Sequence, residues 1–317
     1  METARRVGRV LRVVAVAAAL LSLAACGDDN DAASEPKAAD TTASGDECPA
    51  SSAPVRDIRY ETVPGVEPSL VSLDVYPATS DCPAPVVIWV HGGGWRTGDK
   101  RNQMIDKVRL WNDAGYTIVS VNYRLTDPAA AAPVMYPTHN EDVAAAVGWV
   151  HDNIAKYGGD PARIALLGHS AGAQIVASIA TDERYLGEHG LPLSTLTCAA
   201  PLDTEGFDVA RAAGSGNTVY VSAFGPDPGK WIEASPILHV ASGKDIPPML
   251  LVERGTPGRM RALQQFADTL RNAGVPVTVI AGGALTHAQV NSNIGAVGDT
   301  VMTAPMTTFL DSCFRAR

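Results

Sequence analysis

Residues 163–172 read RIALLGHSAG, an apolar run that ends at Gly168 and places Ser170 on a turn before a helical stretch. Glycines stand two positions before and two positions after this serine. A serine held in a strained turn between a strand and a helix needs small residues at these positions, because the strand and the helix close around it. The spacing therefore predicts an exposed serine hydroxyl at a helix N-terminus, where free N–H groups favour negative charge.

A second apolar run, residues 86–90, leads into the motif HGGGW at residues 91–95. Three consecutive glycines let the backbone turn its N–H groups inward, toward an oxygen that becomes negative during acyl transfer. We predict that the amides of Gly93, Gly94 and Ala171 form such an oxyanion hole. Together the two motifs predict an enzyme with Ser170 as its nucleophile.

From about Val55 to its C-terminus the chain resembles the α/β-hydrolase fold. Within that fold it is similar to the esterases and lipases related to hormone-sensitive lipase and to bacterial feruloyl-esterase-like enzymes. Besides the two glycine motifs, the resemblance rests on NYRL at 122–125, GDP at 159–161 and a late Thr286-His287. It implies a mostly parallel central sheet with an antiparallel N-terminal edge and helices on both faces.

The hydrophobic pattern predicts the same class of fold. Residues 55–60 and 69–76 alternate apolar and polar side chains, as antiparallel edge strands do, whereas residues 86–90 are continuously apolar, as buried parallel strands are. Further strands are expected over residues 116–121, 164–167, 195–200, 249–252 and 277–280. Helices are expected over residues 102–114, 140–157, 171–181 and 259–273, with a last helix ending near residue 311.

Residues 203–244 are rich in glycine and proline, and we expect an irregular segment that acts as a lid or as a wall of the acyl pocket. Its large apolar residues could line a substrate pocket or could form a small core of the segment itself. These residues are Phe207, Phe224, Trp231 and Ile237.

The catalytic base is expected to be His287. In this fold the nucleophile comes first in the chain, then the acid, then the histidine. His287 follows the last expected strand and a short loop, whereas His189 and His239 lie in irregular segments. We interpret His169 as a packing residue and His91 as a hydrogen-bonded support for the glycine loop.

The acid of the triad is where the chain departs from the family. Relatives carry an aspartate in a turn after the penultimate strand, but residues 252–259 read VERGTPGR. Asp203, at the end of the preceding strand, is favoured over Glu253, and a third possibility is that neutral groups hold His287. The alternative for Asp203 is a loop cap, and for Glu253 a surface ion pair with Arg254 or Arg259. The acid must accept the Nδ1 proton of His287 and stabilise the imidazolium.

Two further charged residues follow from the resemblance. Asp142 opens the long helix at a position where relatives also carry an aspartate, and we expect it to serve stability. Arg124 is expected to form a salt bridge under the active site, with binding of an anionic substrate group as the alternative.

The N-terminus is predicted to direct export. Four arginines precede an apolar run over residues 13–25, which is too short to span a membrane. Residues 23–26, LAAC, resemble a bacterial lipobox, so residues 1–25 are expected to be a lipoprotein-type signal peptide, with Cys26 lipidated; an ordinary secretory signal is the alternative. Residues 26–47 are expected to form a disordered tether and residues 48–317 one catalytic domain. The mature protein is thus expected outside the cytoplasm, as a membrane lipoprotein or otherwise secreted.

Charge argues against a nucleic-acid partner. The 317-residue chain carries a formal charge of −9, and residues 1–25 hold four Arg and one Glu, so their removal gives −9 − 3 = −12. Phosphate binding needs clustered Lys and Arg, which this sequence lacks.

After Cys26, an even number of cysteines is left, which suits two disulfides in an oxidising compartment. We favour Cys48 with Cys82 and Cys198 with Cys313 among the three possible pairings. The cysteine spacings match no zinc pattern, and no cluster of metal ligands is apparent, so we expect neither a metal nor a cofactor.

The sequence thus predicts a serine carboxylesterase that cleaves a small-molecule ester through an acyl-enzyme at Ser170. An amidase or peptidase that uses the same triad is an alternative, because GHSAG does not separate ester from amide cleavage. A catalytically impaired hydrolase that binds a ligand at the cell surface is another, because the acid is not in its usual place.

Overall fold

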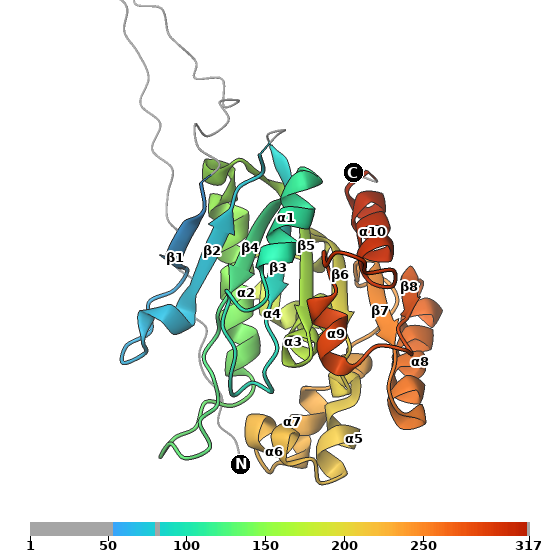
Figure 1. The fold of residues 1–317 in the computed structure, drawn as a ribbon. Coiled ribbons are helices and arrows are strands. Elements are labelled where there is room, and N and C mark those ends of the chain that lie inside the picture. Colours follow the sequence, from blue (N-terminus) through green and yellow to red (C-terminus); the bar gives the residue numbers. More distant parts are fainter. Residues whose placement is uncertain (1–52, 80–82, 316–317) are drawn as a thin grey trace, which may run out of the picture. The chain divides into compact units, whose positions relative to one another are not determined.

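The structure is a computed structural model that describes residues 53–79 and 83–315. The strands are β1 (Val55–Arg59), β2 (Ser72–Tyr76), β3 (Ala84–Val90), β4 (Thr117–Val121), β5 (Gly159–His169), β6 (Leu196–Leu202), β7 (Met249–Glu253) and β8 (Val277–Ala281). In the described residues these eight strands form one sheet in the order β1-β2-β4-β3-β5-β6-β7-β8 (Figure 1). Strand β2 pairs antiparallel with β1 and with β4, and the other neighbours pair parallel. The predicted α/β-hydrolase sheet with its antiparallel edge is confirmed.

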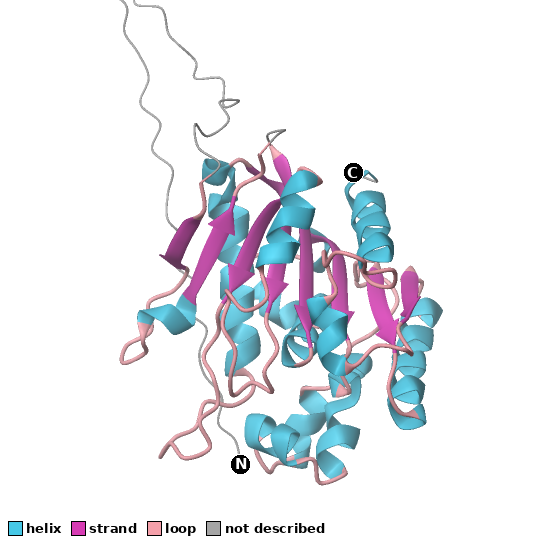
Figure 2. Cartoon of the chain, in the orientation of Figure 1, coloured by secondary structure: helices cyan, strands magenta, loops and turns pink. Residues whose placement is uncertain are grey.

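Helices cover both faces of this sheet, as Figure 2 shows. They are α1 (Ile105–Asp113), α2 (Thr138–Asn153), α3 (Ala171–Thr181), α4 (Glu183–Gly187), α5 (Val209–Gly214), α6 (Thr218–Phe224), α7 (Pro228–Glu233), α8 (Pro257–Asn272), α9 (His287–Ser292) and α10 (Thr303–Arg315). The short helices α4 and α9 were not predicted from the sequence. All the predicted strands and long helices are present, with ends shifted by a few residues.

Strand β3 shows how the core is divided between the two faces. Its residues alternate between two apolar clusters, because neighbours along a strand point to opposite faces. Val86, Ile88 and Val90 belong to the cluster that includes residues of α2, α3 and α8, and Val87 and Trp89 to the cluster that includes residues of α1, α9 and α10. A strand covered on both faces is apolar throughout, which explains the unbroken run over residues 86–90.

The segment 203–244, expected to be irregular, is largely helical. It contains α5, α6 and α7 and two 3₁₀ turns, and these helices lie together beyond the carboxyl ends of the parallel strands (Figure 1). The helices have only six or seven residues each, and side-chain caps from Asp208, Asn217 and Asp227 begin them. Helices this short show little periodicity, and glycine and proline at their ends made the segment resemble a loop.

The predicted disulfide between Cys198 and Cys313 is wrong, because both side chains are buried thiols that are not bonded to each other. Cys198 on β6 and Cys313 on α10 belong to the same apolar cluster, where a thiol packs as a small hydrophobic group. Cys26, Cys48 and Cys82 lie outside the described residues, as do the predicted signal peptide and tether. No helix among the described residues is long and apolar enough to cross a membrane.

Candidate active site

Ser170 lies on the sharp turn between β5 and α3. Its backbone has φ 58° and ψ −114°, a left-handed conformation that a residue with a Cβ rarely adopts. A Cβ on Gly172 would lie 2.4 Å from the carbonyl oxygen of Val90, and one on Gly168 would lie 2.6 Å from that of Gly172. Only glycine therefore fits at either position, as the sequence spacing predicted.

The structure brings Ser170, His287 and Asp203 together from three elements. Nε2 of His287 lies 2.8 Å from Oγ of Ser170, and Nδ1 of the same ring lies 2.6 Å from Oδ2 of Asp203. Asp203 directly follows β6, has φ 57° and is 3% exposed, whereas the His287 side chain is 44% exposed. Because a carboxylate can only accept, Nδ1–H of His287 donates to Asp203, which leaves Nε2 free to accept the proton of Ser170.

Glu253, the alternative acid, does not reach His287. It ends β7 and accepts a hydrogen bond from Nε2 of Gln264 at 2.5 Å. Its expected partners Arg254 and Arg259 bind Asp203 instead, each through one of the two carboxylate oxygens. The surface ion pair suggested for Glu253 is therefore wrong.

The hydrogen-bond partners of Asp203, which include both arginines, determine its charge state. Burial raises the pKa of this carboxyl group, but hydrogen bonds from His287, Arg259 and Arg254 outweigh that effect and hold the pKa well below its usual range. Asp203 is thus ionised at any pH at which the protein is expected to work. Sequence reasoning missed the role of both arginines, because it considered them only as partners of Glu253.

Helix α9 begins at His287 and is fixed at both ends. Thr286 caps it, and the side chain of Gln289 reaches back to the backbone N–H of Thr286, so the two residues form a capping box. Near the other end, Nζ of Lys107 donates to the carbonyl oxygens of Asn291 at 2.9 Å and Gln103 at 3.0 Å. The Thr-x-x-Gln pattern in the sequence was the signal that could have predicted this helix.

The glycine loop follows β3 and lies beside Ser170. Gly93 and Gly94 have φ of 121° and 61°, and the carbonyl of Gly93 accepts from the N–H groups of Arg96 and Thr97, which closes the turn. Both glycines line the cavity that contains Ser170 and His287. Ala171 is the first residue of α3, and the backbone N–H groups of a helix's first turn have no acceptor within the helix.

His91 and His169 have the supporting roles that we expected. The Nδ1–H of His91 donates to the carbonyl of Gly92 at 2.7 Å, and its ring stacks on Tyr123. His169 is 7% exposed, and its Nε2–H donates to the backbone oxygen of His287 at 2.9 Å. The second contact was not predicted, and it links the strand before Ser170 to the residue whose Nε2 lies 2.8 Å from the serine hydroxyl.

Asp142 and Arg124 form a buried ion pair with each other. The carboxylate of Asp142 is fully buried and accepts from the backbone N–H of Arg124 at 2.8 Å and from its Nε at 2.9 Å. Such a paired, hydrogen-bonded charge is structural, as we expected for both residues. Asp142 does not open the helix as predicted, however, because α2 begins at Thr138 and Asp142 is its fifth residue. Neither residue lines the two cavities that contain Ser170.

Two cavities meet at Ser170 and His287. The smaller, about 160 Å³, extends toward the helical segment, and the larger, about 540 Å³, extends between the glycine loop, α9 and the loop before α1. Residues 203–244 line the smaller one through Thr204, Glu205, Asn217, Val219 and Tyr220.

The large apolar residues considered for this wall do not line either cavity that contains Ser170, and two of them pack against residues outside the segment. Phe207 stacks on Phe266, and Phe224 packs edge-on against Trp95. The indole N–H of Trp231 donates to the carbonyl of Gly225.

One group of possible metal ligands occurs among the described residues. It consists of His169, Asp203 and His287, whose ligand atoms lie within 4.8 Å of one another. Both oxygens of Asp203 already accept from guanidinium groups, and Nε2 of His169 is bonded to a carbonyl. A cation at this position would compete with these bonds and with two positive charges, so the donor set does not fit a metal.

The chain is similar in sequence to a family model and to proteins named esterases. Residues 73–190 match the BD-FAE family model. Esterase LipQ of Mycobacterium tuberculosis is 30% identical over 203 residues, which are 60% of this chain and 47% of LipQ. Carboxylesterase NlhH of the same organism is 42% identical over 111 residues, which are 34% of this chain and 32% of NlhH. The chain thus spans less than half the length of these curated relatives.

Solved structures are similar in fold. A truncated form of a carbohydrate esterase from gut microbiota superposes with a TM-score of 0.67 at 22% identity. The superposition covers 85% of this chain and 100% of that chain. At this identity the likeness supports the fold, and the chemistry is argued from the site itself.

Proposed function

We propose that this chain, which is similar to α/β-hydrolase esterases in sequence and fold, is a serine carboxylesterase with Ser170 as nucleophile, His287 as base and Asp203 as acid. The observation that carries the proposal is the continuous hydrogen-bond chain from Oγ of Ser170 through both nitrogens of His287 to Oδ2 of Asp203. The names of the matched relatives, esterase and carboxylesterase, support the same reaction. No cofactor is needed for it.

The reaction follows from the positions of these groups. Nε2 of His287 takes the hydroxyl proton as Oγ of Ser170 attacks the ester carbonyl carbon, and Asp203 stabilises the imidazolium. The carbonyl oxygen becomes negative and receives hydrogen bonds from the N–H groups of Gly93, Gly94 and Ala171. When the tetrahedral intermediate collapses, the C–O bond breaks and His287 returns the proton to the departing alcohol. Water activated by His287 then releases the acid from Ser170.

The sizes of the two cavities support short-acyl esters as substrates. The cavity of about 160 Å³ is smaller than sites that hold drug-sized ligands, which are roughly 300 Å³ or more, so it suits a short acyl group. The larger cavity includes Ala288 and Asn291 of α9, on the side where His287 would protonate the leaving alcohol. Side chains of Asn102, Gln103 and Asn291 line it, and their amide groups suit a polar alcohol.

The direct test measures hydrolysis of p-nitrophenyl acetate together with labelling by a fluorophosphonate probe. We expect wild-type protein to turn over the ester and to be labelled at one residue, and Ser170→Ala to lose both properties. Ser312→Ala, on α10 and far from Ser170 in the sequence, is the matched control and should behave as wild type. Wild-type protein that neither hydrolyses the ester nor is labelled would contradict the proposal.

We also propose that the protein is exported and held at a membrane through a lipid on Cys26. The support is the sequence alone, with four arginines, a short apolar run and LAAC at residues 23–26. In cells fed radioactive palmitate, the full chain should be labelled and should partition into detergent, whereas Cys26→Ser should do neither. Equal partitioning of the two proteins would contradict the anchor and leave the esterase proposal intact.

A further inference from the structure

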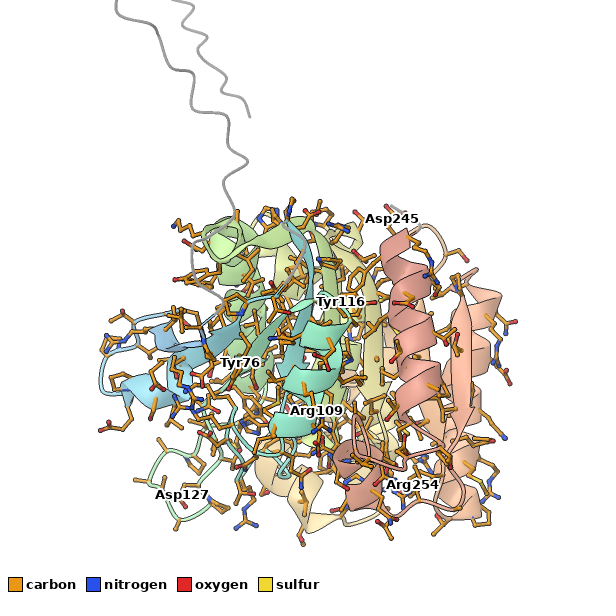
Figure 3. All side chains as sticks on the ribbon, turned by 45° about the horizontal axis from the view of Figure 1, so that its top comes forward. Tyr76, Arg109, Tyr116, Asp127, Asp245 and Arg254 are labelled. Carbon is orange, nitrogen blue, oxygen red and sulfur yellow. The ribbon has the colours of Figure 1, made fainter. Side chains whose placement is uncertain are left out.

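Arg254 lies directly after β7, in the turn where the related enzymes are expected to carry their acid. Its Nη1 forms an ion pair with Oδ2 of Asp203 and lies 3.3 Å from Nδ1 of His287. Its Nε donates to the carbonyl oxygen of Leu285 at 3.2 Å, in the loop that leads to α9. The side chain is only 13% exposed, and Figure 3 labels Arg254 beside the segment that carries α9. One guanidinium group thus contacts the acid, the base and the loop that holds the base.

The approach of Arg254 to His287 is not a hydrogen bond. The Nδ1 proton of His287 points to Asp203, so Nδ1 has no lone pair left to accept an N–H from the arginine. The 3.3 Å separation therefore brings a positive charge close to a ring that becomes positive when it is protonated. This charge opposes protonation of His287, whereas the carboxylate of Asp203 favours it.

Charged and titratable groups face His287 from each element that contacts it. Asp203 follows β6 and Arg254 follows β7, and Arg259 on α8 donates to Oδ1 of Asp203 at 2.8 Å. From β5, the ring of His169 lies 4.6 Å from that of His287, centroid to centroid. Two guanidinium groups thus share one carboxylate with the imidazole, so Asp203 favours imidazolium less than an unshared carboxylate does.

We propose that Arg254 is a positioning residue that fixes the Asp203–His287 pair and whose positive charge keeps His287 unprotonated, and the enzyme active, at lower pH than Asp203 alone would permit. This inference rests on the proposed function. The hydrogen bond to Leu285 and the ion pair with Asp203 provide the positioning, and the short distance to Nδ1 provides the electrostatic effect. Other side chains could hold Asp203 and His287 in place, but only a positively charged side chain can oppose protonation of His287.

The test is the pH dependence of kcat/KM for p-nitrophenyl acetate, paired with the pH dependence of fluorophosphonate labelling, in the full chain. Arg254→Gln removes the charge, and Arg254→Lys retains it while losing the forked hydrogen bonds. Arg254→Met is a second neutral variant, which keeps part of the aliphatic stem in case the glutamine variant does not fold. Arg261→Gln removes an exposed positive charge two residues beyond Arg259 and is the matched control for net charge.

We expect the acid limb of both profiles to move to higher pH in Arg254→Gln and Arg254→Met, by at least about 0.7 pH unit. This is the shift that a unit charge about 4 Å away causes in bulk water, and it is a lower bound because the Arg254 side chain is only 13% exposed. In Arg254→Lys the limb should stay near its wild-type position while kcat falls, and in Arg261→Gln neither property should change. A loss of structure alone would lower the rates without moving the limb.

Two results would overturn the inference. One is an acid limb of the neutral variants that coincides with wild type, and the other is an equal shift in Arg254→Lys and Arg254→Gln. Failure of the proposed function is recognised separately, because the wild-type protein would then be neither active nor labelled at any pH.

Discussion

The ring of His169 packs against the ring of His287, with 4.6 Å between the centroids, and its Nε2–H donates to the backbone oxygen of His287. Burial and then the neighbouring His287 lower the pKa of His169 to about 4. His139 is also buried, next to Thr126, and burial followed by the charge of Arg124 lowers its pKa to about 3. Both imidazoles are therefore neutral in the folded protein at neutral pH.

Neutral buried histidines make stability depend on pH in a defined direction. An unfolded chain protonates these histidines near pH 6.5, whereas the folded chain stays neutral down to about 4 at His169 and about 3 at His139. Unfolding then takes up protons, so the stabilisation is complete above pH 6.5 and is lost as the pH falls below it. We expect the free energy of unfolding to fall between pH 7 and pH 4, and to fall by about 2 to 3 kcal/mol less in His139→Gln.

Denaturant unfolding at several pH values between 7 and 4 measures this difference. Gln can still donate to Thr126, so the variant loses the titration and keeps the hydrogen bond. His151→Gln is the control, since the His151 side chain is 38% exposed, and its curve should run parallel to wild type. A parallel curve for His139→Gln as well would show that this histidine does not contribute.

The two candidate acids should differ strongly in their effect on turnover. Asp203→Asn keeps the shape of the side chain, but the neutral amide no longer holds His287 in the required tautomer, so kcat is expected to fall by about four orders of magnitude. Glu253→Gln, which alters only a contact with Gln264, should stay within about twofold of wild type. Steady-state hydrolysis of p-nitrophenyl acetate measures both, and a large loss in Glu253→Gln with little loss in Asp203→Asn would reverse our assignment.

Gly172 should not tolerate a methyl group. Its Cβ would lie 2.4 Å from the carbonyl of Val90 and 2.6 Å from that of His91, and both are backbone atoms that cannot turn aside. Gly172→Ala is therefore expected to cost at least about 3 kcal/mol of stability and to abolish labelling of Ser170. Gly187→Ala is the comparison, because a Cβ added there would have no atom within 4 Å and the residue ends a helix. It should be neutral or slightly stabilising by thermal denaturation.

The sequence predicted the residues of the candidate site better than their contacts. Ser170 could be predicted because its strained turn demands glycines at fixed spacing, and His287 because it follows the last strand. Asp203 was one of two candidates, since the choice depended on which carboxylate the arginines reach. That question concerns residues about fifty positions apart and leaves no local pattern.

The helices of residues 203–244 likewise could not be predicted from a local sequence pattern. The strands of the sheet and the long helices that cover it were predicted because their hydrophobic pattern extends over many residues. Helices α5, α6 and α7 are too short for that, and their caps and their packing against one another define them instead. Of the two roles left open for Phe207, Phe224, Trp231 and Ile237, lining of the pocket is not seen, because other residues of the segment, such as Thr204, Val219 and Tyr220, line the cavity beside Ser170.

Val219 is expected to limit the length of the acyl chain. It lies on α6 and lines both the cavity of about 160 Å³ beside Ser170 and a neighbouring cavity of about 390 Å³. Its Cγ1 lies close to Gly94, where an added Cβ would be 3.2 Å away, so its branched side chain stands at the boundary between the two spaces. Val219→Ala removes two methyl groups from this boundary and should connect the cavities.

We therefore expect Val219→Ala to raise kcat/KM for p-nitrophenyl hexanoate relative to the acetate by about tenfold, because each methylene accommodated in an apolar pocket is worth about 1 kcal/mol or more. The measurement is the ratio of kcat/KM over a series of acyl lengths, which cancels differences in folded fraction. Ile232→Ala on α7 truncates another exposed apolar residue, which does not line either cavity, and should leave the ratio unchanged. An unchanged ratio in Val219→Ala would mean that longer acyl chains do not extend toward α6, and the larger cavity beside α9 would then be the acyl site.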